Sequence, residues 1–403
     1  MSEFAVPGAV APDPGLRDRV AVVGVGTTDF PSDYRDTRRG AGGQNAAFDM
    51  MGVAFGRAAG DAGLAPETID GLSVCGVEEQ SGTVLRRVAD QVGIRPAYAV
   101  HDSGIMAGVI PRAVEALVQG RCRTMALLYA GTRRRQGATF GGFKSVTGPT
   151  SYFFYHPWGW SSQAAHWAMT FQRYMNQYGV TEGDLGQVAV TLRRNATLNE
   201  NAIMRSPLDI DGYLASRHVV RPLRVLDLCL VSDGAVCLIL SSVELSDRST
   251  PVPVLVSGWG EAAVQRAKLD YLIRHGLRPL FERSAADALA MAGVTEGDID
   301  LFEGYDSSSV HLINQLEGYG FCTPGKALVD WSAGDMELEG RLPVNTNGGM
   351  LSEAFMHGWT QVVELVRQLR RECGERQVKV ARRGMSSLAT TESAHPLILT
   401  RGA

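Results

Sequence analysis

The chain has 403 residues, a net charge of −4 and 45% hydrophobic residues, which is the composition of an ordinary soluble globular protein. Its length exceeds a single ordinary core and favours two or three units, or one duplicated α/β fold. The weakly acidic balance gives no sign of a nucleic-acid-binding surface, and no apolar run is long enough to span a membrane.

Residues 1–18 are rich in Pro, Gly and Ala and lack the basic and apolar segments of a secretory signal, so we expect a flexible leader. The 6 cysteines are scattered through the chain without CxxC spacing. Their pattern argues against a metal site and a disulfide framework, and it favours the reducing cytoplasm.

The first strand covers residues 19–26 and ends in Gly24 and Gly26. This pair is a weak dinucleotide fingerprint, because no third glycine and no acidic residue follow at the required places. An amphipathic helix is expected over residues 45–64, followed by a turn and a strand over residues 72–74.

Two distant stretches share one pattern, residues 61–76 (DAGLAPETIDGLSVCG) and residues 291–306 (MAGVTEGDIDLFEGYD). In both, Ala-Gly and an apolar residue precede a polar turn, then Ile-Asp and a strand, and both follow an alanine-rich helix. We interpret this as an internal duplication of a β-α-β unit. The sequence therefore predicts two α/β halves, over residues 19–245 and 252–403.

The first half is expected to contain an insertion over residues 133–222, which begins with three arginines and is rich in aromatic residues. An aromatic excursion from a rigid sheet suits a substrate wall or lid, for which Tyr155 and Trp158 are candidates. The alternative is an oligomer interface or local core. The remaining elements expected in this half are strands over 97–101, 124–129 and 236–241 and helices over 108–120, 162–178 and 184–198.

The second half is centred on residues 302–322, FEGYDSSSVHLINQLEGYGFC. A short strand over residues 299–302 runs into Tyr305-Asp306-Ser307-Ser308-Ser309 and then into a helix over residues 311–319. Helix N-termini present unpaired N–H groups and positive partial charge, so polar side chains at this junction predict a functional site. The alternative is that the serines only cap the helix.

The end of the chain begins with a Gly-rich turn over residues 342–350, LPVNTNGGM. Gly348 and Gly349 would permit close backbone approach and an anion hole there. The elements expected after it are a helix over 354–373, a strand over 377–381, a turn over 382–387 and a strand over 396–400.

Five motifs, in this order and spacing, resemble the thiolase superfamily: RVAVVGVGTTDF, DAGLAPETIDGL, SDGAV, GYDSSSVHLINQLEGYGFC and NTNGGMLSEAFMHG. The resemblance is strongest to its branch of sterol-carrier-type, lipid-transfer thiolase-like proteins, which includes the steroid side-chain aldolases. It implies the αβαβα thiolase fold, with two mixed-sheet halves, a loop insertion in the first half and a tight homodimer.

The same resemblance identifies groups that are missing. The nucleophilic cysteine of thiolases falls near Gly104, within a stretch that contains no cysteine. The family's Gly-His-Pro is Ala354-Phe355-Met356, its second reactive cysteine is replaced within residues 383–387, and Tyr305 stands in the place of an asparagine. Claisen chemistry needs a cysteine thiolate that carries the acyl group. The resemblance therefore implies that the groups for acyl transfer through an acyl-cysteine are absent from this chain.

The aldolases of this branch also lack the cysteines, and they resemble this chain in having Tyr-Asp at the position of Tyr305-Asp306. They carry a second tyrosine at the position of Phe355, and a phenyl ring cannot transfer a proton. One half of the aldolase pair is therefore missing.

Tyr305 is the leading candidate for proton transfer or oxyanion stabilisation, the alternative being a buried tyrosine bonded to backbone. Asp306 is expected to orient Tyr305 or shift its pKa, or else to cap the helix. His357 is the candidate replacement for the missing phenol, although on a helix it would point to another side. Arg133, Arg134 and Arg135 suit the phosphates of coenzyme A or a solvated face. The candidates for substrate binding are His101, Asp102, Ser103, Ser307, Phe355, Gly348, Gly349, Tyr155 and Trp158.

Together, the resemblance and the departures from it predict a carbon–carbon lyase that cleaves a β-hydroxyacyl-CoA by a retro-aldol reaction. We expect no covalent intermediate and no cofactor beyond the coenzyme A of the substrate. The alternatives are an inactive acyl-CoA-binding subunit of a complex and an acyltransferase or condensing subunit without a covalent cysteine. The resemblance also implies a DUF35-type partner protein with an OB-fold and a zinc ribbon.

Overall fold

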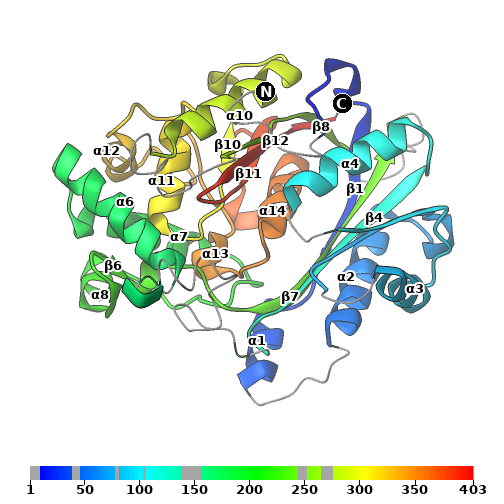
Figure 1. The fold of residues 1–403 in the computed structure, drawn as a ribbon, viewed down its shortest axis with the longest axis horizontal. Coiled ribbons are helices and arrows are strands. Elements are labelled where there is room, and N and C mark those ends of the chain that lie inside the picture. Colours follow the sequence, from blue (N-terminus) through cyan, green and yellow to red (C-terminus); the bar gives the residue numbers. More distant parts are fainter. Residues whose placement is uncertain are drawn as a thin grey trace.

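The computed structural model describes residues 10–38, 46–77, 81–102, 106–135, 137, 156–158, 160, 162–243, 252–264 and 276–402. Strands run through the middle of the molecule, and helices pack on either side of them (Figure 1). Among the helices in these ranges, none is both long and apolar enough to cross a membrane.

The strands of the first half lie side by side in the order β3-β2-β4-β7-β1. Their bounds are Val20–Thr27 (β1), Gly71–Cys75 (β2), Tyr98–Asp102 (β3), Thr124–Thr132 (β4) and Asp233–Ser242 (β7). β2 is parallel to β3 and β4, whereas β7 is antiparallel to β4 and β1. The central strands are buried on both faces, which explains why they are continuously apolar.

The second half repeats this order as β10-β11-β12-β8. The bounds are Val254–Trp259 (β8), Ala262–Ala263 (β9, paired with β12), Leu301–Glu303 (β10), Arg383–Ala389 (β11) and Ser393–Arg401 (β12). β10 is parallel to β11, and β12 is antiparallel to β11 and β8. Val344 forms a parallel bridge to Phe302, in the place that β3 takes beside β2. The strand order therefore confirms the predicted duplication.

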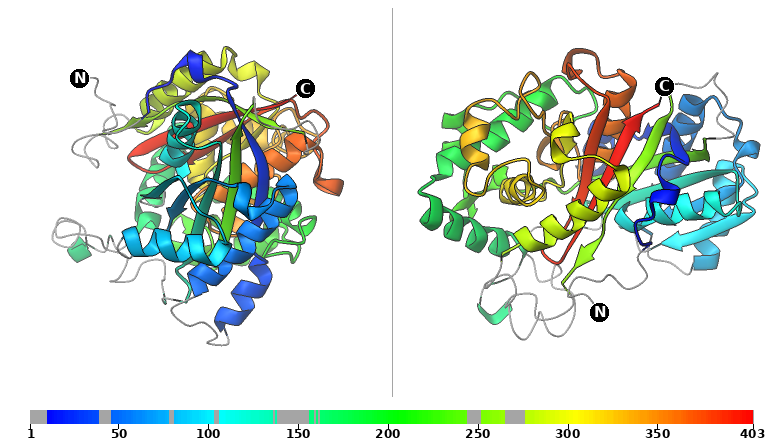
Figure 2. Two further views of the ribbon diagram at one scale, coloured as in Figure 1. Left: turned by 90° about the vertical axis from the view of Figure 1, so that its right-hand side faces the viewer. Right: turned by 90° about the horizontal axis from the view of Figure 1, so that it is seen from above.

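The two halves meet where β1 and β8 pair antiparallel, through Ala21–Leu255 and Val22–Val254. α2 and α3 pack on the strands of the first half, and α10 packs on β8 and β12. α4 and α14 contact strands of both halves, so they form a central helix layer between two sheet regions (Figures 1 and 2). These helices are α2 (Ala46–Ala62), α3 (Ser81–Val92), α4 (Met106–Val118), α10 (Arg278–Ala292) and α14 (Trp359–Arg370).

The described part of the insertion packs against the second half as local core. Asn195 donates through Nδ2 to the carbonyls of Val344 and Asn345 at 3.3 and 3.2 Å. The indole N–H of Trp331 donates to Thr191 Oγ1 at 3.0 Å. The insertion contains α6 (Gln163–Tyr178), α7 (Glu182–Thr197), α8 (Ile210–Ala215) and β5 (His218–Val220), and β6 (Leu223–Arg224) follows it directly. The other α-helices in the described part of the chain are α1 (Phe30–Arg38), α11 (Ser309–Gly318), α12 (Ala327–Ser332) and α13 (Gly349–Ser352).

Part of the predicted leader is fixed to the second half. The Val10 carbonyl accepts the indole N–H of Trp259 at 3.0 Å, and the Asp18 N–H donates to Val256 O at 3.0 Å. Residues 10–18 thus lie against β8, while residues 1–9 and the predicted boundary at residues 246–251 fall outside the described ranges. The two domain ranges remain predictions.

Three expectations for the end of the chain are wrong. The helix expected from residue 354 begins at Trp359, because His357 and Gly358 before it have positive φ angles of 49° and 85°. Residues 377–381 form no strand. Residues 383–387 of the expected turn belong to β11, which pairs with β10 and β12. Arg-Arg-Gly favoured a turn locally, but burial between two partner strands overrides that preference.

A buried guanidinium at the end of α14 joins the two halves. Arg370 Nη1 lies 2.7 Å from the Asp61 carboxylate of α2, and the Arg370 side chain is 0% exposed. Its other nitrogens donate to the carbonyls of Val22 and Val252 at 3.4 and 3.2 Å. Asp61 also accepts the Val25 N–H at 2.8 Å, so this ion pair binds β1, α2 and the start of β8 together.

We predict that Arg370→Ala destabilises the protein by about 3 kcal/mol, because it leaves a partly buried carboxylate and two carbonyls unpaired. Arg283→Ala is the matched control, since Arg283 forms a surface pair with Asp287 that is worth less than about 1 kcal/mol. Urea unfolding of both variants measures the difference. Equal unfolding free energies for the two variants would contradict this role of Arg370.

Candidate active site

The serines of the polar run after β10, residues 305–309, make different contacts. Ser308 is the N-cap of α11, and its hydroxyl accepts the His311 N–H at 3.1 Å. Ser307 Oγ lies 2.8 Å from His311 Nδ1, and its carbonyl accepts the Cys229 N–H at 3.2 Å. The capping alternative therefore holds for Ser308, while Ser307 orients a buried histidine.

Tyr305 is the first residue of this polar run, and its side chain is buried. Its N–H donates to Gln315 Oε1 at 3.1 Å, and its carbonyl accepts from Gln315 Nε2 at 2.8 Å. These contacts fix its backbone without using the hydroxyl. Its ring centroid lies 5.8 Å from that of His311 and 6.4 Å from that of Phe355, edge-on in both cases. Burial raises the pKa of the Tyr305 phenol, and the nearby Arg133 partly opposes this.

The Asp306 carboxylate binds backbone N–H groups rather than the Tyr305 hydroxyl. It is 0% exposed, and its two oxygens accept the N–H groups of Met350 and Leu351 at 2.9 and 3.0 Å. Gln361 Nε2 lies 3.3 Å from Oδ1. Burial raises the pKa of Asp306 to about 6, although the backbone N–H donors oppose this. Asp306 therefore caps a helix, as in the alternative, but the helix is α13 rather than the one that follows it in sequence.

The Gly-Gly turn does not form the expected anion hole. The N–H groups of Gly348 and Gly349 are bonded to Asn345 O at 2.9 Å and Asn347 Oδ1 at 2.8 Å. Both glycines have positive φ, and a Cβ on Gly349 would lie 2.2 Å from Asp306 Oδ2. The backbone at Gly349 does approach an anion closely, as expected. That anion is the Asp306 carboxylate of the chain itself rather than a bound ligand. The backbone N–H groups of Gly348 and Gly349 are therefore occupied within the chain, and a substrate contact of these two glycines stays a prediction.

Three residues from two distant segments, Arg133, Phe355 and His357, meet beside Tyr305. His357 Nε2 lies 2.6 Å from Arg133 Nη2, and the Arg133 guanidinium lies 5.1 Å from the centroid of Phe355. The rings of Phe355 and His357 are 4.8 Å apart. His357 lies in the loop before α14 rather than on that helix, so it reaches this cluster. Burial, and then Arg133, lower the pKa of His357 to about 3.

The serine and aspartate of the SDGAV motif hold this cluster in place. Ser232 Oγ accepts the Phe355 N–H at 2.9 Å. Asp233, which is 0% exposed, accepts the N–H groups of Arg134 and Arg135 at 2.8 and 3.1 Å. The motif that begins β7 therefore fixes both the aromatic residue and the turn that carries the arginines.

Sequence reasoning missed two buried groups in the same place, Tyr129 and Cys229. Tyr129, near the end of β4, lies 5.7 Å from His357 and stacks on Trp359 at 5.8 Å between centroids. Burial raises the pKa of the Cys229 thiol, then Asp306 raises it further, so Cys229 is a neutral thiol rather than a nucleophile. The only available signal was that an apolar strand ends in a tyrosine.

The other predicted substrate contacts have partners outside this cluster, are exposed, or fall outside the described residues. His101 Nε2 lies 3.0 Å from Val77 O, and Asp102 is paired with Arg112 of α4. Trp158 is 84% exposed, and its place in a substrate wall stays a prediction. Ser103 and Tyr155 fall outside the described ranges.

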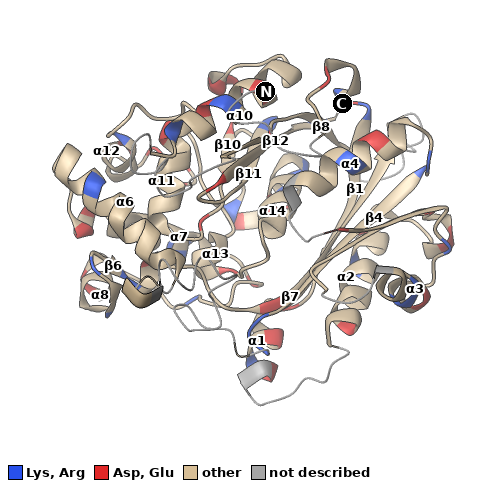
Figure 3. Ribbon diagram, viewed as in Figure 1, with Lys and Arg blue, Asp and Glu red and all other residues tan. Residues whose placement is uncertain are grey.

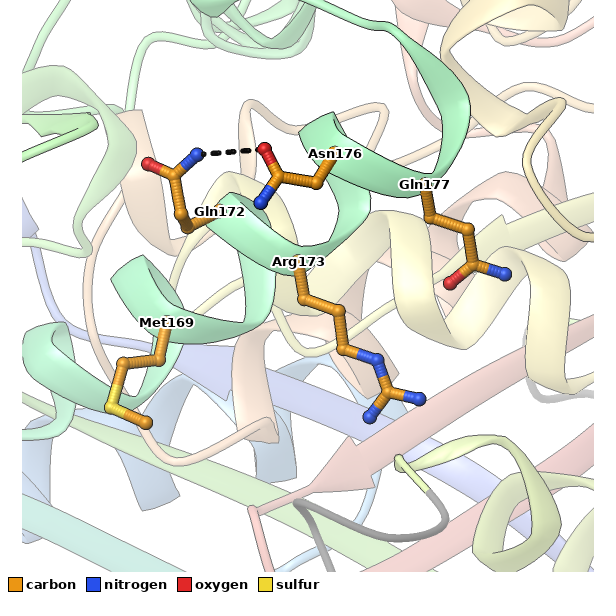
Figure 4. A pocket seen from close by; sticks show the side chains of 5 residues that line it. All are labelled: Met169, Gln172, Arg173, Asn176 and Gln177. Carbon is orange, nitrogen blue, oxygen red and sulfur yellow. Dashed lines mark hydrogen bonds between the residues drawn. The ribbon is translucent and has the colours of Figure 1, made fainter.

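Two open hollows on the described surface do not contain these residues. One of about 510 Å³ lies on the outer face of α6, where Met169, Gln172, Arg173, Asn176 and Gln177 line it (Figure 4). Another lies along α3. Acidic and basic residues are interspersed along the elements (Figure 3), so neither hollows nor bulk charge identify the site.

A network of buried carboxylates lies behind the Asn-Thr-Asn segment. Glu303 Oε1 accepts from the Thr346 hydroxyl at 2.7 Å, and Glu353 accepts from Asn199 and Asn347 at 2.9 and 2.6 Å. Burial, and then Glu364, raise the pKa of Glu353 to about 8. These groups support the turn from behind.

We predict that Asp306→Asn destabilises the fold by about 1–3 kcal/mol, because an amide turns one acceptor into a donor facing a backbone N–H. Asp90→Asn, on a carboxylate that is 63% exposed, should change stability by less than about 0.5 kcal/mol. Denaturant unfolding measures both. An unchanged unfolding free energy in Asp306→Asn would contradict the capping role and would favour the predicted catalytic role of Asp306.

A second prediction concerns pH. The folded pKa of Glu353 lies above its unfolded value of 4.5, so its contribution to stability is present below about pH 4.5 and is lost as pH rises through about 8. The melting temperature of Glu353→Gln minus that of the parent should therefore increase from pH 5 to pH 9. Glu337→Gln, on the surface, controls for loss of a carboxylate, and a flat difference for Glu353→Gln would refute the shift.

Comparisons with known proteins agree with the fold and its duplication. Residues 276–401 match the thiolase C-terminal domain-like family. The chain is 32% identical over 373 residues to a 17-hydroxy-3-oxo-4-pregnene-20-carboxyl-CoA lyase of Mycobacterium tuberculosis, covering 88% of this chain and 92% of the relative. It is 30% identical over 371 residues to a steroid side-chain-cleaving aldolase of Thermomonospora curvata, covering 88% and 91%.

Among solved structures, an Ltp2-ChsH2(DUF35) aldolase superposes with a TM-score of 0.82 at 28% identity, over 96% of this chain and 98% of that chain. A monomeric SCP2-thiolase-like protein of Mycobacterium smegmatis shares the fold, with a TM-score of 0.69 at 16% identity, over 96% of this chain and 77% of that chain. The chain therefore belongs to the thiolase superfamily, in the lipid-transfer, sterol-carrier-type thiolase-like branch that includes the steroid side-chain aldolases.

Proposed function

We propose that this protein is a carbon–carbon lyase that cleaves a β-hydroxyacyl-CoA thioester by a retro-aldol reaction, with a steroid or similar lipid side chain as the acyl group. The observation that carries the proposal is the likeness, over nearly the whole length of both chains, to a lyase and an aldolase named for such substrates.

The residues of the site suit a reaction without a covalent intermediate. Tyr305 is a phenol among apolar and aromatic rings, at the position where the aldolases of this branch resemble the chain. A positioned acid or base contributes about 10²–10⁴-fold to such proton transfers. Cys229, the cysteine beside it, is neutral because burial raises its thiol pKa, so acyl transfer through that sulfur is disfavoured.

Phe355 supports the second candidate, a subunit that binds acyl-CoA without turning it over. Its ring lies edge-on to Tyr305 at 6.4 Å, where a tyrosine would place a second phenol. His357 is a poor substitute, because its pKa is lowered to about 3 by burial and by Arg133. The Tyr305 phenol must then serve both proton transfers, or another group must assist, either the buried Tyr129 phenol beside His357 or a group from a partner.

We also propose that the protein works with a DUF35-type partner and as a homodimer. The solved aldolase that it resembles at 28% identity is an Ltp2-ChsH2(DUF35) aldolase. For the dimer, β3 is the last strand of the described sheet, and its residues are only partly buried. An edge strand offers unpaired N–H and C=O groups to another strand, so β3 suits pairing across a two-fold axis.

We predict that Tyr305→Phe lowers the catalytic rate at least about a hundredfold, because it removes the proton-transferring hydroxyl and keeps the ring. Ketone release from a branched β-hydroxyacyl-CoA, measured with the DUF35 partner present, checks this. Phe355→Tyr restores the aldolase phenol and should raise the rate. Tyr178→Phe, on the outer face of α6 and 37% exposed, is the matched control.

Three outcomes separate the candidates. An active Tyr305→Phe variant beside an inactive His357→Ala variant would move the proton transfer to His357. A parent that is inactive while Phe355→Tyr is active would make the natural chain a binding subunit. A parent that releases no ketone, alone or with the partner, would overturn the lyase proposal.

A further inference from the structure

Arg133 lies in the turn that follows β4, and Asp233 fixes that turn. The Asp233 carboxylate accepts the N–H groups of Arg134 and Arg135 and lies 3.2 Å from Arg135 Nε. Because Asp233 is 0% exposed, the backbone of the turn is held firmly. The Arg133 side chain is left to extend toward the loop before α14, where it meets His357 and the face of Phe355.

The contact between Arg133 and His357 defines the state of the histidine. A guanidinium has only N–H donors, so His357 Nε2, at 2.6 Å from Arg133 Nη2, is the acceptor and carries the lone pair. His357 holds a positive φ of 49°, which aims it from the loop at the arginine. Its lone pair is thus occupied, and His357 is a positioning residue for Arg133 rather than a free base.

The same guanidinium faces the groups around Tyr305. Its Cζ lies 5.1 Å from the Phe355 ring centroid, and Phe355 lies 6.4 Å from Tyr305. The bond to His357 uses one nitrogen of a fork that carries five N–H donors. Arg133 is also solvent-accessible, so a ligand can reach its remaining donors.

The reaction needs a group for the charge that develops on the thioester oxygen. The backbone N–H groups of Gly348, Gly349, Met350 and Leu351 are already bonded, so the Gly-Gly turn offers no oxyanion donor. A guanidinium matches planar oxygen anions with paired donors. Preorganised donors of this kind give a large share of the rate in such reactions.

We propose that Arg133, held by His357, binds the thioester oxygen and stabilises the enolate that forms on it. This inference rests on the proposed lyase function. The hydroxyl on Cβ gives its proton to the Tyr305 phenolic oxygen while that phenol releases its own proton toward Cα. The Cα–Cβ bond breaks and its electron pair forms the enolate, while Cβ becomes the ketone carbon. Cα then takes up a proton, so atoms and charge balance without another reactant.

The test compares two thioesters of one branched β-hydroxyacyl group, made with coenzyme A and with pantetheine, which lacks the nucleotide phosphates. With the partner present, Arg133→Ala should lower kcat about 10²–10³-fold on both, as loss of an oxyanion donor does. Added guanidinium ion should restore part of the lost rate. The kcat of Arg133→Lys should lie between those of the parent and Arg133→Ala. Arg194→Ala, which removes a surface ion pair, should have the kcat of the parent.

His357 has its own pair of variants. His357→Gln keeps an acceptor for Arg133 but cannot act as a base, so it should retain activity within about tenfold of the parent, whereas His357→Leu should approach Arg133→Ala, whose loss is about 10²-fold or more. Equal inactivity of the Gln and Leu variants would overturn the positioning role and make His357 a base.

Two further results would overturn the assignment of Arg133. Full activity of Arg133→Ala on both thioesters would show that it has no catalytic role. A loss confined to KM for the coenzyme A thioester would make it a phosphate contact instead. A parent without ketone release would overturn the lyase function and this assignment together, whereas an active parent with an unaffected Arg133→Ala variant overturns the assignment alone.

Discussion

The site depends on one buried carboxylate at the start of a short helix. Asp306 comes from the segment after β10, and its two oxygens bind the N–H groups of Met350 and Leu351 in α13. A carboxylate buried at a helix start is favourable because it meets unpaired N–H groups and the positive end of the helix dipole. This clip joins the Tyr-Asp motif to the Asn-Thr-Asn-Gly-Gly motif and fixes Tyr305 relative to Phe355.

Other contacts extend the clip into a rigid frame. Asn345 bonds Gly304 on both its N–H and its carbonyl, at 2.7 and 3.1 Å, and Ser232 holds the Phe355 backbone. Within this frame, the backbone N–H groups of Gly348 and Gly349 are already hydrogen-bonded to other residues of the chain. A reaction on a thioester in this place therefore relies on side chains, and among the described residues these include the phenols of Tyr305 and Tyr129, a neutral thiol, a histidine and a guanidinium.

The ring of Phe355 gives the site its particular character. This apolar ring lies under the Arg133 guanidinium, whose Cζ is 5.1 Å from the ring centroid. A cation over an aromatic face is attracted by the electrons of the ring. Phe355 and His357 together thus position Arg133 and hold its positive charge at the site.

The sequence alone determined most of the order of elements, the duplication and the place of Tyr305 after a strand. These depend on periodicity and on motifs within short segments, which local sequence specifies. Only the tertiary structure decided the role of Asp306, the use of the Gly348 and Gly349 N–H groups, and the meeting of Arg133 with His357, 224 positions apart. Such partners are chosen by how distant segments pack, because a side chain's hydrogen bonds depend on which groups burial brings within reach.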